Sequence, residues 1–129
     1  SGTPMDFRQL KPIGAEIDEA YEALEFGKGY DHNWVLNKKG YRKAAFMRSK
    51  ESGIAMEVYT DLPGLQFYTA NFVDHEKGKE GAVYNMRQAA CFETQYFPDA
   101  VHKDHFEGPE VKAGEIYETT TAYRFIKGE

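Results

Sequence analysis

The sequence predicts a mainly antiparallel all-β protein with one short helix near its N-terminus. Three observations lead to this fold class. Short segments rich in β-branched and aromatic residues recur along the chain. Several of these segments alternate between apolar and polar side chains, which is the period of a strand. Turn-forming glycine, proline and asparagine residues separate them at short intervals, so we expect antiparallel strands packed as a two-layer sandwich.

The expected helix lies near the N-terminus. Ile17, Tyr21 and Leu24 are spaced so that they would share one face of a helix. Gly27 and Gly29 follow, and glycine commonly ends a helix at such a place. We therefore expect a short helix through these residues that ends near Gly27 and packs outside the sheet.

Four strands are predicted in the middle of the chain, with hairpin-like turns between them. In the third strand, Ile54 belongs to an alternating apolar set that forms a packing face, whereas Glu57 and Tyr59 lie on a polar and aromatic face. In the turn before the fourth strand, Pro63 fixes φ and Gly64 is expected to have positive φ. The four strands cover approximately residues 34–36, 43–48, 53–60 and 65–69.

Two further strands are predicted nearer the C-terminus. The charged, glycine-rich segment 74–81 comes first and predicts a solvent-exposed loop. A strand over residues 90–97 follows and stops at Pro98. The last strand covers residues 116–126, where β-branched and aromatic side chains dominate.

Glu93 is the candidate catalytic residue of this sequence. Strand alternation places it with Cys91 and Gln95 on one face of a segment that otherwise resembles a buried strand. A desolvated carboxylate is costly unless it is paired or protonated, and desolvation raises its pKa toward the range useful for proton transfer. Glu93 is therefore a candidate general acid or base. The alternative is a glutamate on the solvated face of an edge strand.

Composition excludes several classes of function. The chain has 129 residues and a net charge of −5 with both signs interspersed, so it lacks the basic stripe that nucleic acid requires. No polybasic cluster indicates an anionic membrane, and no apolar run is long enough to cross a bilayer. We expect neither nucleic acid nor a membrane as a partner.

The cysteine and the histidines add little chemistry of their own. Cys91 is the single cysteine, so it cannot form an internal disulfide, and a reducing cytoplasmic location suits it. It is expected to be a small packed residue. His102, Asp104 and His105 resemble a metal clamp only weakly, because a clear further ligand is lacking, and no metal site is expected.

The sequence resembles the galactose mutarotase (aldose 1-epimerase) family over nearly its full length, in the C-terminal half of that family's chain. A family-like opening, GTPMDFR at residues 2–8, lies well inside a typical mutarotase sequence. Four separated motifs occur in the expected order. They are GYDHNWVL at 29–36, PGLQFYT at 63–69, CFETQYFPDA at 91–100, and GEIY at 114–117 followed by TTAYRF at 120–125.

This resemblance implies the fold and the domain organisation. Mutarotases have a large β-sandwich of the supersandwich type, and residues 1–129 would form the C-terminal portion of that single domain. The N-terminal half would then be a partner, supplied by the same precursor or by a separate chain. A partial sandwich leaves open strand edges and uncovered apolar faces, so the segment is expected to behave poorly alone.

The resemblance also implies a chemistry. Glu93 matches the family's general base, which removes the proton from the anomeric hydroxyl of an aldohexose such as galactose or glucose. No cofactor is required. Asp31 and Gln66 match positions that hydrogen-bond sugar hydroxyls, although taken alone Asp31 is also suited to a turn and Gln66 to an outward strand position. In the family, the general acid and a second substrate-contacting residue are histidines, joined by an arginine, and all lie in the N-terminal half, so this chain alone is expected to be inactive.

Two other functions stay open at the level of the sequence. A glycoside hydrolase or lyase on a similar sandwich would pair Glu93 with a second carboxylate such as Asp31. A noncatalytic carbohydrate-binding domain would bind sugar without turning it over. The sequence departs from the family at Ala70, where glycine is common, and at Trp34, where phenylalanine is common. Both are expected to be tolerated.

Overall fold

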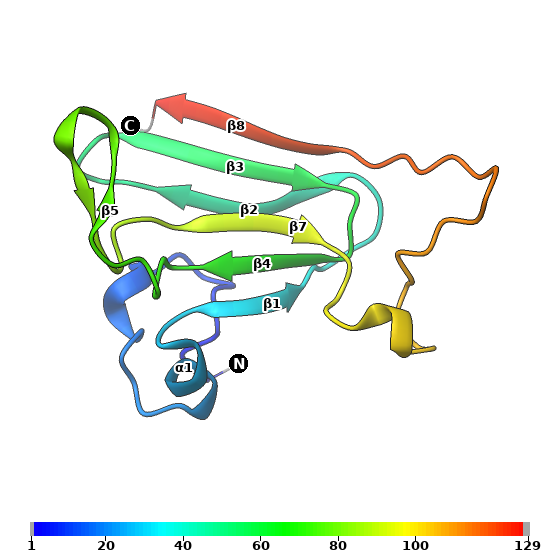
Figure 1. Cartoon of the computed structure of the whole chain (residues 1–129), viewed down its shortest axis with the longest axis horizontal. Helices are drawn as coiled ribbons and strands as arrows, with labels where there is room; N and C mark the ends of the chain where they lie inside the picture. Colours follow the sequence, from blue (N-terminus) through cyan, green and yellow to red (C-terminus); the bar gives the residue numbers. More distant parts are fainter. Residues whose placement is uncertain (1, 128–129) are drawn as a thin grey trace. The chain divides into compact units, whose positions relative to one another are not determined.

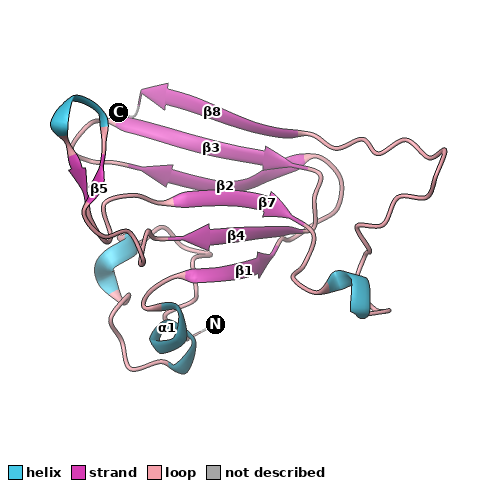
Figure 2. Ribbon diagram, viewed as in Figure 1, coloured by secondary structure: helices cyan, strands magenta, loops and turns pink. Residues whose placement is uncertain are grey.

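The computed structural model describes residues 2–127 and consists mainly of short β-strands (Figure 1, Figure 2). The all-β prediction is therefore confirmed. The strands are β1 (Asp31–Val35), β2 (Arg42–Arg48), β3 (Ile54–Thr60), β4 (Gly64–Tyr68), β5 (Glu76–Lys77), β6 (Val83–Tyr84), β7 (Cys91–Gln95) and β8 (Thr121–Lys127). The helices are α1 (Glu22–Gly27) and three 3-10 turns at Ile13–Ala15, Lys79–Gly81 and Ala100–His102.

The strands form three sheets. One has the order β1-β4-β7, the second β2-β3-β8, and the third is the pair β5-β6. The contacts divide the described chain into two compact units. The first contains residues 2–32 with Phe67–Cys91, and the second contains Asn33–Gln66 with residues 92–127. Each unit is described by itself.

The core of the first unit is aromatic. Tyr30 has an exposed fraction of 0%, and its ring stacks on that of Phe67 at a centroid distance of 5.6 Å. The ring of Phe7 meets Tyr30 edge-on at 5.0 Å and Phe67 at 5.6 Å. Offset and edge-to-face pairs of this kind are stabilising beyond the area that they bury. The opening segment of the chain is thereby packed against the residue that precedes β1.

Helix α1 is shorter than the sequence predicts. Leu24 is buried as expected, but Ile17 lies outside the helix, which begins only at Glu22. Tyr21 before it has extended backbone dihedrals, and no side chain caps the start. So short a helix depends on its packing more than on its sequence. It ends at Gly27, as predicted, and the next residue, Lys28, has left-handed dihedrals and donates its N–H to the carbonyls of the last turn.

The charged segment 74–81 is exposed as predicted, but it is not an irregular loop. Glu76 and Lys77 of β5 pair antiparallel with β6. Gly78 makes this hairpin possible, because a Cβ at that position would lie 2.4 Å from the ring of Tyr84. The alternation rule overlooks such a strand, since two residues are too few to show a period.

The second unit contains the sheet β2-β3-β8, whose strands lie side by side in Figure 1. Both pairs are antiparallel, with Val58 opposite Ala45 on β2 and opposite Tyr123 on β8. The last strand begins later than predicted, at Thr121, because its partner β3 ends at Thr60, directly opposite. Residues 116–120 are therefore outside the ladder and exposed.

Ala70 follows β4 with φ of 54°, in the left-handed region that favours glycine. It is also 2% exposed, so the strained backbone is fixed by its surroundings. The expectation that alanine is readily tolerated here is wrong in this respect.

Replacing Ala70 by glycine is expected to raise the free energy of unfolding by about 0.5–1 kcal/mol, because relief of the left-handed strain exceeds the added entropy of the unfolded chain. Urea denaturation measures the change. Ala89→Gly is the matched control, since Ala89 is absent from the residues with positive φ, and it should be neutral or destabilising. A loss of stability in Ala70→Gly would contradict this explanation.

Candidate functional site

Glu93 lies in the middle of β7, and the structure confirms the predicted alternation of that strand. Phe92 and Thr94 are half-buried, whereas Cys91 and Glu93 are exposed. The expected desolvation of Glu93 is therefore absent from this chain, and so is the expected packing of Cys91. β7 is the last strand in its sheet and Glu93 is exposed on it, so within this chain Glu93 matches the alternative of a glutamate on a solvated edge strand.

Side-chain hydrogen bonds with β8 hold β7, the strand that carries Glu93. The hydroxyl of Tyr123 donates to the carbonyl of Phe92 at 2.6 Å. The hydroxyls of Thr94 and Thr121 are also 2.6 Å apart. Both sequence neighbours of Glu93 are thus tied to a second strand, while the carboxylate itself stays accessible to solvent. An accessible carboxylate on a fixed backbone is suited to meet a ligand.

Gln66 lies on β4, the middle strand of the same sheet. Its neighbours Leu65 and Phe67 are buried, whereas Gln66 is half-buried, so its side chain lies on the opposite, more open face of the strand. Glu93 is exposed on β7, the next strand in the order. The sheet thus brings Gln66 and Glu93 to neighbouring strands.

Glycine is required at position 64, the first residue of β4, for a reason other than the predicted one. Its φ is not positive. Instead, a Cβ at this position would lie 2.6 Å from Oδ1 of Asn33 and 3.0 Å from the ring of Phe97. Glycine is needed because two side chains approach the backbone closely. Asn33 in turn accepts a hydrogen bond from Nε2 of Gln95 at 3.2 Å.

Asp31 is the first residue of β1, in the first unit, and is half-buried. It belongs to a strand, so the alternative of a turn residue is not what the structure shows. Its backbone N–H donates to Nδ1 of His32 at 3.0 Å, and Nε2 of the same ring lies 2.9 Å from the carbonyl of Ala23. His32 therefore links helix α1 to the backbone of Asp31.

The other histidines have local partners. His75 contacts Asp74, and His102 contacts Asp99 at 2.5 Å. The ring of His105 lies 4.3 Å from that of Phe106. Across residues 2–127, no three histidine, cysteine, aspartate or glutamate side chains gather as metal ligands.

Glu57 is a carboxylate whose environment the sequence did not reveal. It is 9% exposed on β3 and accepts hydrogen bonds from Lys43 at 3.0 Å and Tyr59 at 2.9 Å, with Arg124 at 3.5 Å. The hydrogen bonds from Lys43 and Tyr59 lower the pKa of Glu57. The register between β3 and β8 places Glu57 opposite Arg124, but the register of a strand pair cannot be derived from the sequence of one strand. These contacts make Glu57 a structural residue.

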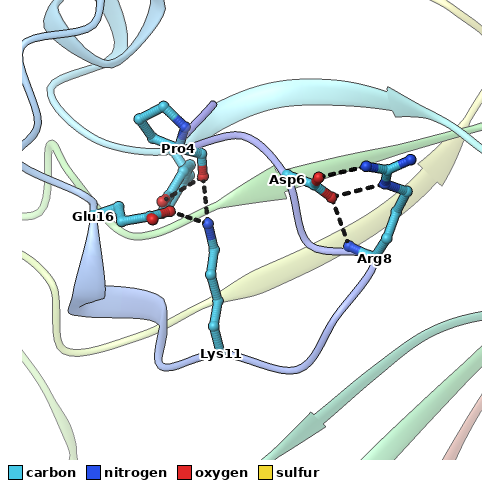
Figure 3. Close-up of polar contacts among 6 residues, drawn as sticks. Pro4, Asp6, Arg8, Lys11 and Glu16 are labelled. Atoms are coloured by element: carbon cyan, nitrogen blue, oxygen red, sulfur yellow. Dashed lines mark hydrogen bonds and ion pairs between the residues drawn. The ribbon is translucent and has the colours of Figure 1, made fainter. Parts of the chain in front are cut away.

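The N-terminal segment carries a separate polar cluster, drawn in Figure 3. The carbonyl of Pro4 accepts from Nζ of Lys11 at 2.9 Å, and Lys11 also pairs with Glu16. Arg8 binds both carboxylate oxygens of Asp6, and this pairing holds the pKa of Asp6 far below its usual range. These charges neutralise one another, so the cluster stabilises the segment and offers no unbalanced charge to a ligand.

Helices of the described chain are all too short or too polar to cross a bilayer.

Comparison with known proteins gives consistent matches. The family model described as aldose 1-epimerase matches residues 1–124. The chain is 41% identical over 126 residues to galactose mutarotase of Bos taurus, and this match covers 96% of the chain and 35% of that protein. It is 33% identical over 132 residues to aldose 1-epimerase of Escherichia coli strain K12, covering 98% of the chain and 37% of that protein.

A solved structure agrees with these matches. The crystal structure of the GalM/aldose epimerase homologue from C. elegans is 29% identical, with a TM-score of 0.86, and covers 100% of the chain and 38% of that protein. The chain spans about a third of the length of the curated relatives that it matches.

Proposed function

Because the chain belongs to the aldose 1-epimerase family, we propose that it forms the base-carrying and sugar-anchoring part of an enzyme that interconverts the α and β anomers of an aldohexose such as galactose. The observation that carries the proposal is that Glu93 and Gln66 stand on neighbouring strands of one sheet, each on the more open face of its strand. A carboxylate and an amide so arranged suit a polyhydroxylated ligand.

The proposed reaction begins when Glu93 takes the proton from the hydroxyl on C1 of the sugar. The electron pair left on that oxygen forms the C1 carbonyl as the bond between C1 and the ring oxygen breaks. A general acid protonates the ring oxygen, which gives the open-chain aldehyde. Rotation about the C1–C2 bond exposes the other carbonyl face, and the reverse proton transfers close the ring to the other anomer. No atom is gained or lost overall.

Binding is assigned to Asp31 and Gln66. The Asp31 carboxylate would accept hydrogen bonds from sugar hydroxyls, and the Gln66 amide would both donate and accept. Such contacts fix the ring against the base, which makes proton transfer effectively intramolecular. We place the general acid in the part of the family fold that lies outside this chain.

The test is polarimetry on freshly dissolved α-galactose. A chimera serves as the complete enzyme in this test. In it, this chain replaces the 35% of bovine galactose mutarotase that it matches. We expect the chimera to accelerate the change in optical rotation and the 129-residue chain alone to have no effect. Sugar release from an aryl galactoside without anomer exchange would indicate a glycoside hydrolase. Galactose binding without turnover in the chimera would indicate a noncatalytic binding domain.

A further inference from the structure

The turn that follows β4 holds the peptide that joins Tyr30 to Asp31. Thr69 and Asn71 belong to this turn, and each is 3% exposed. The backbone N–H of Thr69 donates to the carbonyl of Tyr30 at 3.0 Å, and the hydroxyl of Thr69 accepts from the N–H of Tyr30 at 3.2 Å. Tyr30 is thus bound through both its backbone groups by one residue.

Asn71 completes the arrangement. Its Nδ2 donates to the carbonyl of Tyr30 at 2.9 Å and to the carbonyl of Gly27 at 2.8 Å. Its Oδ1 accepts from the hydroxyl of Thr69 at 2.7 Å. All the polar atoms of the Asn71 side chain are therefore used inside a buried site, where losing one partner would leave another group unsatisfied.

The other end of the same peptide is held by His32. The peptide carbonyl, which belongs to Tyr30, is bound by the turn, and the peptide N–H, which belongs to Asp31, donates to Nδ1 of His32. The side chain of Tyr30 adds a third anchor, because its hydroxyl donates to the carbonyl of Pro4 at 3.1 Å. The plane of this peptide fixes the position of the Asp31 Cα, and with it the point from which the Asp31 side chain leaves the backbone.

We propose that Thr69 and Asn71 are positioning residues that aim the Asp31 carboxylate at the sugar. This inference rests on the proposed function of Asp31 as a sugar ligand. Neither residue needs to touch the sugar, since both act through the peptide before Asp31. Because Asp31 is a binding residue and not the base, a displaced Asp31 weakens binding of the sugar more than it slows proton transfer.

The experiment is a double-mutant cycle in the chimera, with anomer exchange of galactose followed at several concentrations. Thr69→Val keeps the volume of the side chain but removes the hydroxyl, and it should raise KM roughly tenfold with a smaller change in kcat. Thr69→Ser keeps the hydroxyl and should restore KM. In an Asp31→Asn background, Thr69→Val should change KM by less than about twofold, because the group that it positions is already altered.

The outcomes separate this inference from the proposed function. If Asp31→Asn leaves KM unchanged, Asp31 is not a sugar ligand and both ideas fall. Suppose instead that Asp31→Asn raises KM. If the effect of Thr69→Val on KM is then fully additive with that of Asp31→Asn, or if Thr69→Ser raises KM as much as Thr69→Val, Thr69 has only a structural role. Either result overturns the positioning inference alone.

A second variant covers the case in which Thr69→Val does not fold. Gly27→Ala would place a Cβ 3.1 Å from the His32 ring, so this ring must move by a few tenths of an ångström, whereas the 3.6 Å to Cβ of Asp31 is an ordinary contact. It removes no hydrogen-bonding side chain. It should raise KM in the wild-type background and not in the Asp31→Asn background. Equal KM effects in both backgrounds would overturn the inference.

Discussion

Replacing Glu93 by glutamine in the chimera is expected to lower kcat for galactose mutarotation at least ~100-fold, the usual contribution of a positioned general base. The amide has nearly the shape of the carboxylate but cannot accept the proton of the anomeric hydroxyl. Polarimetry at saturating galactose measures the change. Glu76→Gln is the matched control, because Glu76 is an exposed glutamate in the β5–β6 hairpin and should retain full activity.

Galactose binding by Glu93→Gln should change little, since the amide can still hydrogen-bond a hydroxyl. Isothermal titration of the inactive variant would measure this directly. A kcat within about threefold of wild type would show that Glu93 supplies none of the general-base contribution. A large loss of binding with unchanged kcat would make Glu93 a sugar ligand only.

Replacing Tyr30 by alanine is expected to lower the free energy of unfolding by about 3–5 kcal/mol, the usual cost of removing a large aromatic side chain from a core. Tyr30 is fully buried between the rings of Phe7 and Phe67. The cavity left behind would border the residue before Asp31, so the start of β1 would lose its main apolar anchor. Urea denaturation of the chimera measures the effect.

Tyr30→Phe is the control for this variant. It keeps the ring and removes only the hydroxyl that donates to the carbonyl of Pro4, so it should cost about 1 kcal/mol. If Tyr30→Ala costs no more than Tyr30→Phe, the aromatic cluster does not stabilise this unit. The account of how the N-terminal segment supports β1 would then be wrong.

The strands were the most predictable part of this protein. Alternation such as that of Phe92, Glu93 and Thr94 is a local property of the chain, and β7 forms as that pattern predicts. The family was also predictable, because its motifs are short, separated and ordered, and the match over residues 1–124 confirms it. The substrate-binding roles of Asp31 and Gln66 remain predictions.

The local pattern left two environments open for Glu93, a desolvated carboxylate and a solvated face of an edge strand, and could not decide between them. Alternation assigns a residue to a face, but only the rest of the fold determines whether that face is covered. The predicted extent of the last strand was wrong for a related reason. Residues 116–120 have the composition of a strand, yet the ladder between β3 and β8 ends at Thr60 and Thr121. Strand pairing is a property of two segments and cannot be derived from one of them.

The hydrogen bonds that hold the backbone before Asp31 could not be predicted from the sequence, for a third reason. Thr69 and Asn71 follow a strand and have ordinary polar side chains for a turn, so the sequence gives no indication of their burial. Their bonds to Tyr30 join residues about forty positions apart. The left-handed backbone of Ala70 between them was equally hidden, because alanine was expected to be tolerated here without a special conformation.

The most direct test of the central claim is chemical rescue of Glu93→Ala in the chimera. The truncated side chain leaves space where a small carboxylate such as formate can serve as the base. We predict that mutarotation without formate is close to the uncatalysed rate, and that formate raises the rate above that of formate and galactose alone. A wild-type rate in the absence of formate would contradict the assignment of Glu93 as the base.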